Sequence, residues 1–437
     1  MNMRYEPINP DLFRLNRKRF SRQMKPNSIA IFHSNDLMPR NGDQTFPFRQ
    51  NSHLFMLSGL DQEETILILY PDCVREECRE IAFVRKTNEH LAVWEGHKYS
   101  KEAARDLSGI SNIQWTDEMS NLLHELIILS DNVYINSNEN KSFSTEVVSR
   151  DVRFAKELRA RYPAHQFLRA QPILTNMTMI KSAFEVELMQ EAMDITEKAF
   201  RKVLQFVKPG VAEYEIEAEI IHQFMRNRAN GHAYHPIIAS GKNACVLHYS
   251  ENNQICQDGD ILLMDFGAEY ANYAADLSRS IPVNGRFSKR QRAVYDSVLH
   301  IMKAATQMLV PGTGMDEYHK EVGKMMEGEL LELKLIDKTD IKNQDPKRPA
   351  YKKYFMHGTS HHLGLDVHDL SYRHIPIQAG MVFTVEPGIY IPEESLGVRL
   401  ENNILVTDDR PIDLMMDIPI EAEAIEECMR SPTEVFS

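Results

Sequence analysis

The sequence predicts two domains of different class, an N-terminal α/β domain and a larger C-terminal α+β domain. In the N-terminal part, short apolar strands alternate with helical stretches. In the C-terminal part, pairs of long helices and sets of strands follow one another in blocks. The chain has 437 residues, which is enough for two or three domains at about 150 residues each.

The first domain is expected to span residues 1–172. An amphipathic helix is predicted within Asn9–Pro26, with a solvated polar face rather than a nucleic-acid or membrane surface. Pro172 predicts a linker at Arg169–Met177. The basic residues expected on the polar face are Arg14, Arg17, Lys18, Arg19 and Arg22. Apolar runs predict strands at Ser28–Phe32, Glu64–Tyr70 and Glu80–Val84, and helical spacing predicts a helix at Ser100–Leu107.

The second domain is expected to span residues 178–430. A polar insert at Asp337–Tyr354 is predicted to be a surface loop. The order of helices, strands, helices and strands hints at an internal duplication, although the two blocks are not visibly alike in sequence. The predicted helices are Ser182–Val207, Ala212–Ala229, Ser288–Leu309 and Met315–Leu333. The predicted strands are Ile261–Phe266, Met381–Pro387 and Gly397–Thr407.

Composition narrows the class of protein. A net charge of −13 argues against a general nucleic-acid binder, which needs a basic face. The five cysteines include no CxxC pair, so reduced thiols in a cytoplasmic protein are expected rather than a disulfide framework or a cysteine zinc site. The first twenty residues contain no apolar signal region, and no apolar run approaches 18 residues, so neither a signal peptide nor a membrane span is expected.

Two aspartates frame the segment that follows a buried strand. Asp265 stands where the apolar run from Asp260 ends, and Asp276 follows a turn at Gly267 and a second strand-like stretch. A hairpin of this length would bring the two carboxylates side by side. Two close carboxylates repel each other in a low-dielectric site, and a metal ion removes the repulsion. Each aspartate by itself could instead cap a turn or form a surface ion pair.

Histidines and glutamates of the same character follow in the C-terminal region. Glu386 ends one apolar strand, and Glu401 lies within another, where an unpaired charge is costly. The HExxH helix of zincins is absent, because position 358 is glycine. Four carboxylates and one imidazole form a hard ligand set, and two divalent ions would neutralise it. The histidines of the segment Phe355–Asp369 are His357, His361, His362 and His368.

These motifs together resemble the pita-bread metallopeptidases, and within them the aminopeptidase P family. The resemblance covers nearly the whole chain, including the spacing of eleven between the aspartates. It implies two divalent ions, with Mn²⁺ expected. Asp265 would bind the first ion, His361 and Glu386 the second, and Asp276 and Glu401 would bridge.

Further positions match the family's substrate-contacting residues. His248 and His368 would shape the proline pocket and shuttle protons, and His357 would also line the pocket. Asp43 matches an acid that pairs with the network arginine in the family, and Trp94 resembles a tryptophan that reaches a neighbouring subunit's cleft. The network behind the site would consist of Tyr234, Tyr390 and Arg399. The chain departs from the family where Asn402 and Asn403 replace a more usual acidic pair, and where His362 stands beside the ligand position.

The resemblance implies an exopeptidase that releases the N-terminal residue from peptides with proline in second position. Glu386 would serve as metal ligand and proton acceptor, and His248 would stabilise the oxyanion. A homodimer or homotetramer is implied, with peptides as partners and without nucleic acid or membrane. The alternatives are a prolidase, which cuts only dipeptides, a pita-bread binding protein without catalysis, and a metal-free creatinase-like hydrolase. The filled ligand positions disfavour the last two.

Overall fold

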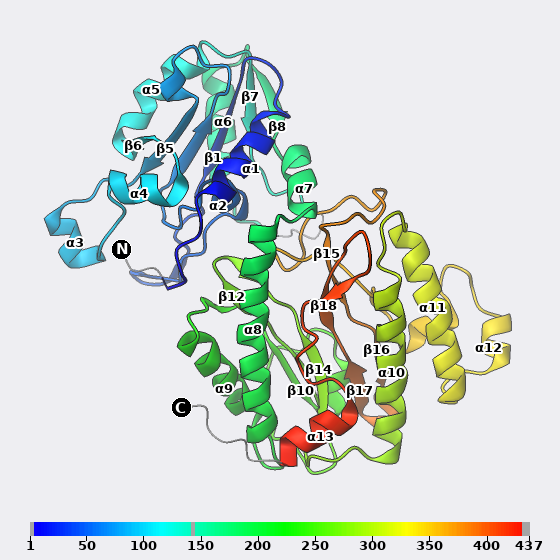
Figure 1. The fold of residues 1–437 in the computed structure, drawn as a ribbon. Coiled ribbons are helices and arrows are strands. Elements are labelled where there is room, and N and C mark those ends of the chain that lie inside the picture. Colours follow the sequence, from blue (N-terminus) through cyan, green and yellow to red (C-terminus); the bar gives the residue numbers. More distant parts are fainter. Residues whose placement is uncertain (1–3, 141–144, 431–437) are drawn as a thin grey trace. The chain divides into compact units, whose positions relative to one another are not determined.

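The computed structural model describes residues 4–140 and 145–430, which form two compact units with the boundary between Thr178 and Met179 (Figure 1). Each unit has its own sheets and helices. Within the described ranges, no helix combines the length and the apolarity needed to cross a membrane.

The N-terminal unit is built on a mixed six-stranded sheet in the order β6-β5-β4-β1-β7-β8. The pairs β1–β4 and β4–β5 are antiparallel, whereas β1–β7, β7–β8 and β5–β6 are parallel. A separate hairpin joins two short strands whose residues are all exposed. The strands are β1 (Ser28–His33), β2 (Pro39–Asn41), β3 (Gln44–Thr45), β4 (Ile66–Leu69), β5 (Glu80–Val84), β6 (Asn112–Trp115), β7 (Asn132–Ile135) and β8 (Gln166–Arg169).

The sequence predicted two helices of this unit, within Asn9–Pro26 and at Ser100–Leu107, whereas the structure contains seven among its described residues. The helices are α1 (Asp11–Ser21), α2 (Ser52–Ser58), α3 (Glu89–Glu95), α4 (Lys101–Ser108), α5 (Met119–Ile127), α6 (Arg150–Arg161) and α7 (Gln171–Met179), with 3₁₀ turns at Glu76–Cys78 and Thr116–Glu118. The expectation of a linker at Arg169–Met177 is wrong, because α7 occupies it. Pro172 is the second residue of α7, and proline is tolerated in a first turn, where its missing N–H would have no partner.

The expected polar face of the first helix also needs one correction. Arg17 is fully buried rather than solvated. Its Nε donates to Glu80 at 2.8 Å, and its Nη1 donates to the carbonyls of Leu57 and Ser108 at 2.9 and 3.0 Å. The side chain therefore ties α1 to the sheet and to the ends of α2 and α4.

The C-terminal unit consists of small antiparallel sheets with long helices packed against them (Figure 1). The helices are α8 (Ala183–Phe206), α9 (Glu213–Arg226), α10 (Lys289–Gln307), α11 (Met315–Glu332), α12 (Lys338–Lys342) and α13 (Ala422–Arg430), with 3₁₀ turns at Gly241–Cys245, Ala350–Lys353 and Pro392–Glu394. The strands are β9 (Gly231–His232), β10 (Ile237–Ser240), β11 (Ile261–Asp265), β12 (Ala268–Tyr270), β13 (Tyr273–Ala274), β14 (Ser278–Pro282), β15 (Val382–Val385), β16 (Gly388–Ile391), β17 (Leu396–Arg399), β18 (Asn402–Leu405) and β19 (Ile412–Asp413).

Local sequence explains where the long helices begin. At α10, the Ser288 hydroxyl accepts from the Gln291 N–H at 3.3 Å, and the Gln291 side chain accepts from the Ser288 N–H at 2.8 Å, which is a capping box. At α8, Glu185 accepts from the Ser182 N–H at 2.8 Å. The helices α8 and α9 pack on each other, and α8 also packs on β12 and β13. The helices thus cover the outer side of the strands that lead to the polar site.

The segment between β11 and β14 brings the two predicted aspartates together. The strands pair antiparallel with Asp265 opposite Ser278, while β12 and β13 form an inner hairpin. Gly267 permits this arrangement, because a Cβ there would lie 1.7 Å from the Ala275 carbonyl oxygen. Asp276, just before β14, therefore returns beside Asp265.

Two expectations about the C-terminal region are wrong in detail. The single strand expected at Gly397–Thr407 is two strands, since β17 pairs with β16 and β18 pairs with β15. Glu401 lies in the break between them, where its N–H donates to the Ser278 carbonyl at 3.0 Å. The expected surface loop at Asp337–Tyr354 contains α12 and a 3₁₀ turn.

Candidate active site

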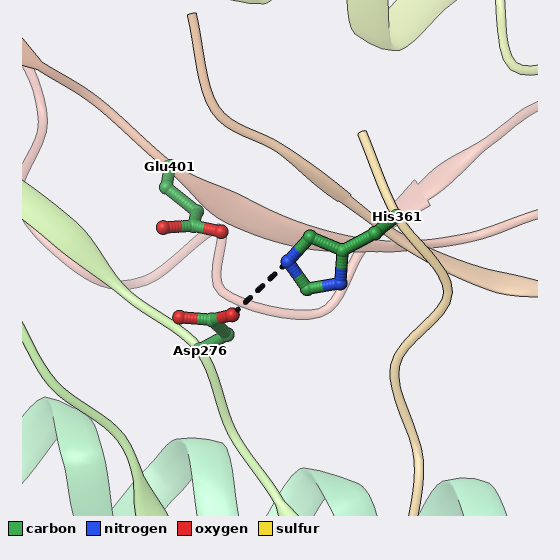
Figure 2. Close-up of side chains that lie close together, drawn as sticks. All are labelled: Asp276, His361 and Glu401. Atoms are coloured by element: carbon green, nitrogen blue, oxygen red, sulfur yellow. Dashed lines mark ion pairs between the residues drawn. The ribbon is translucent and has the colours of Figure 1, made fainter. Parts of the chain in front are cut away.

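Three side chains from distant parts of the chain converge in the C-terminal unit. Ligand atoms of Asp276, His361 and Glu401 all lie within 4.8 Å of one another (Figure 2). The dashed line in Figure 2 joins His361 Nε2 to Asp276 Oδ2 at 3.4 Å. Asp276 lies just before β14, and Glu401 separates β17 from β18. His361 comes from a loop that lies beside β15, where its N–H donates to the Thr384 hydroxyl at 3.1 Å and its carbonyl accepts from the Thr384 N–H at 3.0 Å.

Asp265 and Glu386 adjoin this cluster. The Tyr234 hydroxyl lies 2.5 Å from Asp265 Oδ1 and 2.5 Å from Asp276 Oδ1, so it bridges the two aspartates. Glu386 Oε1 lies 3.6 Å from His361 Nε2. The four carboxylates and His361 line one cavity of about 500 Å³. The structure thus brings together all five residues predicted as metal ligands.

The electrostatics of the cluster favour bound cations. Burial raises the pKa of Glu386 to about 7, against the opposing charges of His361 and Arg399. Burial and the neighbouring carboxylates Asp276, Glu386 and Asp265 raise the pKa of Glu401 well above its usual range. Among the described residues, the buried Glu401 Oε1 has no hydrogen-bond partner. An orphaned carboxylate oxygen that faces other carboxylates fits a divalent cation.

His361 is oriented for ligation by its second ring nitrogen. Nδ1 lies 3.0 Å from the His362 carbonyl oxygen, which can only accept, so Nδ1 carries a hydrogen and Nε2 faces the acids. Although burial lowers it, the hydrogen bond with Asp276 and the charge of Glu386 raise the pKa of His361 to about 9. The neighbouring acids thus favour the protonated, positively charged form of the imidazole. A bound cation would supply that positive charge in place of the proton.

A polar network extends from Asp265 to His357. Arg399 donates from Nη2 to Asp265 Oδ2 at 2.6 Å and from Nη1 to the Tyr390 hydroxyl at 3.0 Å. The Tyr390 hydroxyl lies 2.7 Å from His357 Nε2, and His357 Nδ1 lies 2.7 Å from the Gly358 carbonyl. Burial, with a contribution from Arg399, lowers the pKa of His357 to about 3. His357 is therefore neutral, with Tyr390 donating to its Nε2.

Further predicted substrate-contacting residues line the same cavity. His248 and His368 line the cavity, and the rings of His368 and His361 meet edge to face with centroids 4.4 Å apart. Burial and the neighbouring His361 lower the pKa of His368. The three residues of the predicted network, Tyr234, Tyr390 and Arg399, lie within hydrogen-bond distance of the cluster or of one another.

Three other residues singled out in the sequence are described by their local surroundings within their own unit. Asp43 follows β2 in the N-terminal unit, is exposed and accepts a hydrogen bond from Gln44 at 3.1 Å. Trp94 on α3 is 77% exposed. His362 is buried, and its ring packs against Phe383 with centroids 4.2 Å apart. His362 therefore packs as a core side chain next to His361.

Sequence reasoning missed several residues that shape the site. Ser278 accepts from Arg399 Nε at 2.8 Å and donates to Glu401 Oε2 at 2.8 Å. Asn403 accepts from the Asp276 N–H at 3.0 Å and donates to the Asp276 carbonyl at 2.7 Å. The available signal for both was a position two residues after a ligand candidate, Asp276 or Glu401. The unpredicted cavity residues are His235, Ile237, Leu247, Tyr249, Ser250 and Val367.

Comparison with known families identifies this architecture. Residues 187–408, more than half of the chain, match the model of metallopeptidase family M24. The chain belongs to family M24. Residues 13–134 match the model of the aminopeptidase P N-terminal domain. The M24 match contains all five clustered ligand candidates, and use of divalent metal follows from membership of this family of metallopeptidases.

Relatives of this M24 protein extend over nearly its whole length. The Xaa-Pro aminopeptidase of Haemophilus influenzae is 35% identical, over 95% of this chain and 96% of the relative. A solved structure of a putative aminopeptidase P from Bacillus anthracis is 32% identical with a TM-score of 0.89, over 97% of this chain and 99% of that one. Zinc-substituted Escherichia coli aminopeptidase P in complex with product is 30% identical with a TM-score of 0.86, over 97% and 99% of the chains. The α/β domain followed by a pita-bread domain is therefore confirmed as the fold.

Proposed function

We propose that this M24 protein is a metal-dependent Xaa-Pro aminopeptidase, which releases the N-terminal residue from peptides with proline in second position. The observation that carries this proposal is the set of five ligand candidates in one cavity. Near full-length similarity to proteins named Xaa-Pro aminopeptidase supports it. Proline lacks an N–H and has a fixed φ, so general peptidases handle its bonds poorly and a dedicated pocket is needed.

Two divalent ions are proposed, with Mn²⁺ as the physiological metal. Asp265, Asp276, His361, Glu386 and Glu401 would hold them. When bound, the ions supply positive charge that favours hydroxide over water and stabilises developing negative charge. Four of the five donors are carboxylates, and this oxygen-rich set suits Mn²⁺. A structural zinc site is typically rich in thiolates, which this set lacks.

The side chains of the cavity divide the remaining work. Glu386 accepts the proton of the attacking water and delivers it to the leaving proline nitrogen, a role supported by its position in the cavity, 3.6 Å from His361 Nε2. His248 donates a hydrogen bond to the carbonyl oxygen as that oxygen gains charge. Arg399 and Tyr390 hold Asp265 and His357 in place through the network described above. His248 and His368 shape the pocket for the proline ring and move protons. His357 and Tyr234 also line this pocket.

Other properties are proposed on the family resemblance. The domains are residues 1–172 and 178–430, and the protein is a cytoplasmic homodimer or homotetramer that binds neither nucleic acid nor membrane. On the same resemblance, Asp43 pairs with Arg399, and in the oligomer Trp94 contacts a neighbouring subunit's cleft. The exposure of Trp94 supports this last assignment.

Release of the N-terminal residue from Arg–Pro–Pro and from Arg–Pro tests the proposal, measured after chelation and after addition of Mn²⁺. Metal-dependent cleavage of both peptides, with the tripeptide preferred, is expected. Cleavage of the dipeptide alone would make the protein a prolidase. Absence of cleavage with metal demonstrably bound would reject the proposed substrate.

A further inference from the structure

One wall of the cavity is a loop rather than a regular strand. We call Ser240–Gln254 the cavity loop. It contains a 3₁₀ turn at Gly241–Cys245 and then runs without regular secondary structure. Four consecutive residues of the loop line the cavity: Leu247, His248, Tyr249 and Ser250. A loop that holds a substrate-contacting histidine needs anchors from elsewhere, since it has no strand ladder of its own.

A single buried carboxylate supplies such anchors. Glu213, the first residue of α9, is fully buried. Its Oε1 accepts from the Ser240 N–H at 2.8 Å and from the Ser240 hydroxyl at 2.7 Å. Its Oε2 accepts from the Tyr249 hydroxyl at 2.8 Å and from the Gln254 N–H at 2.9 Å. The carboxylate therefore contacts the first residue, the cavity-facing part and the last residue of the cavity loop.

The same helix provides a second anchor one turn later. Glu217 Oε2 accepts from Asn252 Nδ2 at 2.9 Å, and Asn252 Oδ1 accepts from the Ile238 N–H at 3.0 Å. The Glu213 N–H also donates to the Gln254 carbonyl at 2.9 Å. Residues four apart lie on one face of a helix, so α9 presents both acids to the loop together.

We propose that Glu213 is a positioning residue for the proposed peptidase reaction: it holds the cavity loop, and through it His248 and Tyr249, in the place where substrate binds. This inference rests on the proposed function. Burial of a carboxylate is tolerated here because four donors satisfy it and because it sits at a helix N-terminus. A glutamine at position 213 would point an NH₂ donor at two of these four donors, and the loop would lose two of its anchors.

Hydrogen exchange tests the structural half of the inference without any assay of activity. Glu213→Gln is compared with wild type and with Glu219→Gln, a matched control on the same helix. Peptides covering residues 240–254 should exchange about tenfold faster in Glu213→Gln, with β11 and β15 unchanged. Unchanged exchange in the loop, or faster exchange across the whole C-terminal unit, would overturn the inference. If Glu213→Gln does not fold, Tyr249→Phe removes one of the four donors and should give a smaller increase confined to the loop.

Kinetics on Arg–Pro–Pro test the functional half. A displacement of about 1 Å can cost about 100-fold in rate, so kcat/KM of Glu213→Gln should fall about 10- to 100-fold, with a raised KM. Mn²⁺ affinity, measured by calorimetry, should stay within about twofold of wild type. Lower kcat with unchanged KM would indicate only a smaller folded fraction and would overturn the positioning role. If wild type cleaves neither peptide, the proposed function fails, and the exchange comparison alone decides the inference about the loop.

Discussion

Glu386 combines two roles within one side chain. It adjoins the cluster through His361 at 3.6 Å, and burial raises its pKa to about 7. Glu386→Gln keeps the size of the side chain but cannot accept a proton. We expect kcat to fall about 100- to 10,000-fold, the range for loss of a general base, while circular dichroism stays unchanged.

The control for this variant is Glu394→Gln. Glu394 is a partly exposed residue whose carboxylate pairs with Arg290 at 2.7 Å, away from the cavity. It should retain wild-type kcat. Residual activity of Glu386→Gln at a tenth of wild type or more would exclude Glu386 as the base.

His232 gives the protein a predicted pH dependence of stability. Burial, with a contribution from His235, lowers its pKa to about 4, and neither ring nitrogen has a hydrogen-bond partner among the described residues. The folded state therefore binds fewer protons than the unfolded state between about pH 4 and pH 6.5. Above about pH 6.5 this histidine is neutral in both states and does not lower the free energy of unfolding. As the pH falls toward 4, protonation of the unfolded state lowers that free energy. At pH 5 the loss is about 2 kcal/mol.

Urea unfolding of wild type and His232→Phe at pH 7.5 and pH 5 measures this contribution. Phenylalanine suits the site because the His232 ring packs on Phe224 with centroids 5.0 Å apart. The free energy of unfolding of the variant should fall by about 2 kcal/mol less than that of wild type between the two pH values. Equal losses in both proteins would show that His232 does not titrate as described.

At the scale of single residues, the sequence predicted which side chains could bind metal better than it predicted which side chains would contact one another. The donors Asp265, Asp276 and Glu401 could be recognised because carboxylates at the ends of apolar strands are costly without a partner. Arg17 could not be recognised as buried, because its partners Glu80 and Ser108 are 63 and 91 residues away. The roles assigned to the substrate-contacting residues stay predictions.

At the scale of elements, close backbone packing at Gly267 allows the chain to return Asp276 beside Asp265. Gly267→Ala would place a Cβ 1.7 Å from the Ala275 carbonyl oxygen. We expect the free energy of unfolding to fall by about 1–3 kcal/mol, the usual cost of overpacking, and Mn²⁺ affinity to fall as well. Chemical denaturation and calorimetric titration measure the two effects.

Gly328 provides a control of opposite sign. It lies inside α11, where a Cβ would meet no described atom within 4 Å. Gly328→Ala should raise the free energy of unfolding by about 0.5–1 kcal/mol, because alanine restricts the unfolded chain and favours helix. A stability loss in Gly328→Ala equal to that in Gly267→Ala would contradict the packing argument.

The sequence predicted element boundaries wrongly where tertiary contacts override the local sequence pattern. The stretch Gly397–Thr407 was predicted as one strand, yet it divides at Glu401 because its two halves pair with different strands, β16 and β15. Pro172 signals a break in sequence but lies in the first turn of α7, where it is compatible with helix. The long helices were predictable because their capping residues and apolar spacing are local.

At the scale of the whole molecule, bound metal should stabilise the C-terminal unit. The clustered carboxylates repel one another, and an ion that binds only the folded state adds about 2.7 kcal/mol at 100 times its dissociation constant. Chelation should therefore lower the melting temperature, and Mn²⁺ should restore it. Hydrogen exchange should place the change at β11, β14 and β18, and not in the six-stranded sheet. A melting temperature insensitive to both treatments would argue against ions in the cluster.

Fold class was predictable at this scale because composition, element order and the five donors agree with one family. The full-length similarity to Xaa-Pro aminopeptidases confirms that reading of the fold. The domain limits at residues 172 and 178 and the oligomeric state stay predictions.

The distribution of the five donors along the chain has a consequence for synthesis on the ribosome. The first donor is Asp265 and the last is Glu401, and the peptide N–H of Glu401 closes onto Ser278. A nascent chain that has just exposed the two aspartates still lacks every other ligand. Metal therefore cannot assist the early steps of folding, because it can bind and stabilise only a chain that is nearly complete. Any fragment ending before Glu401 should emerge without a competent metal site, however well its helices form.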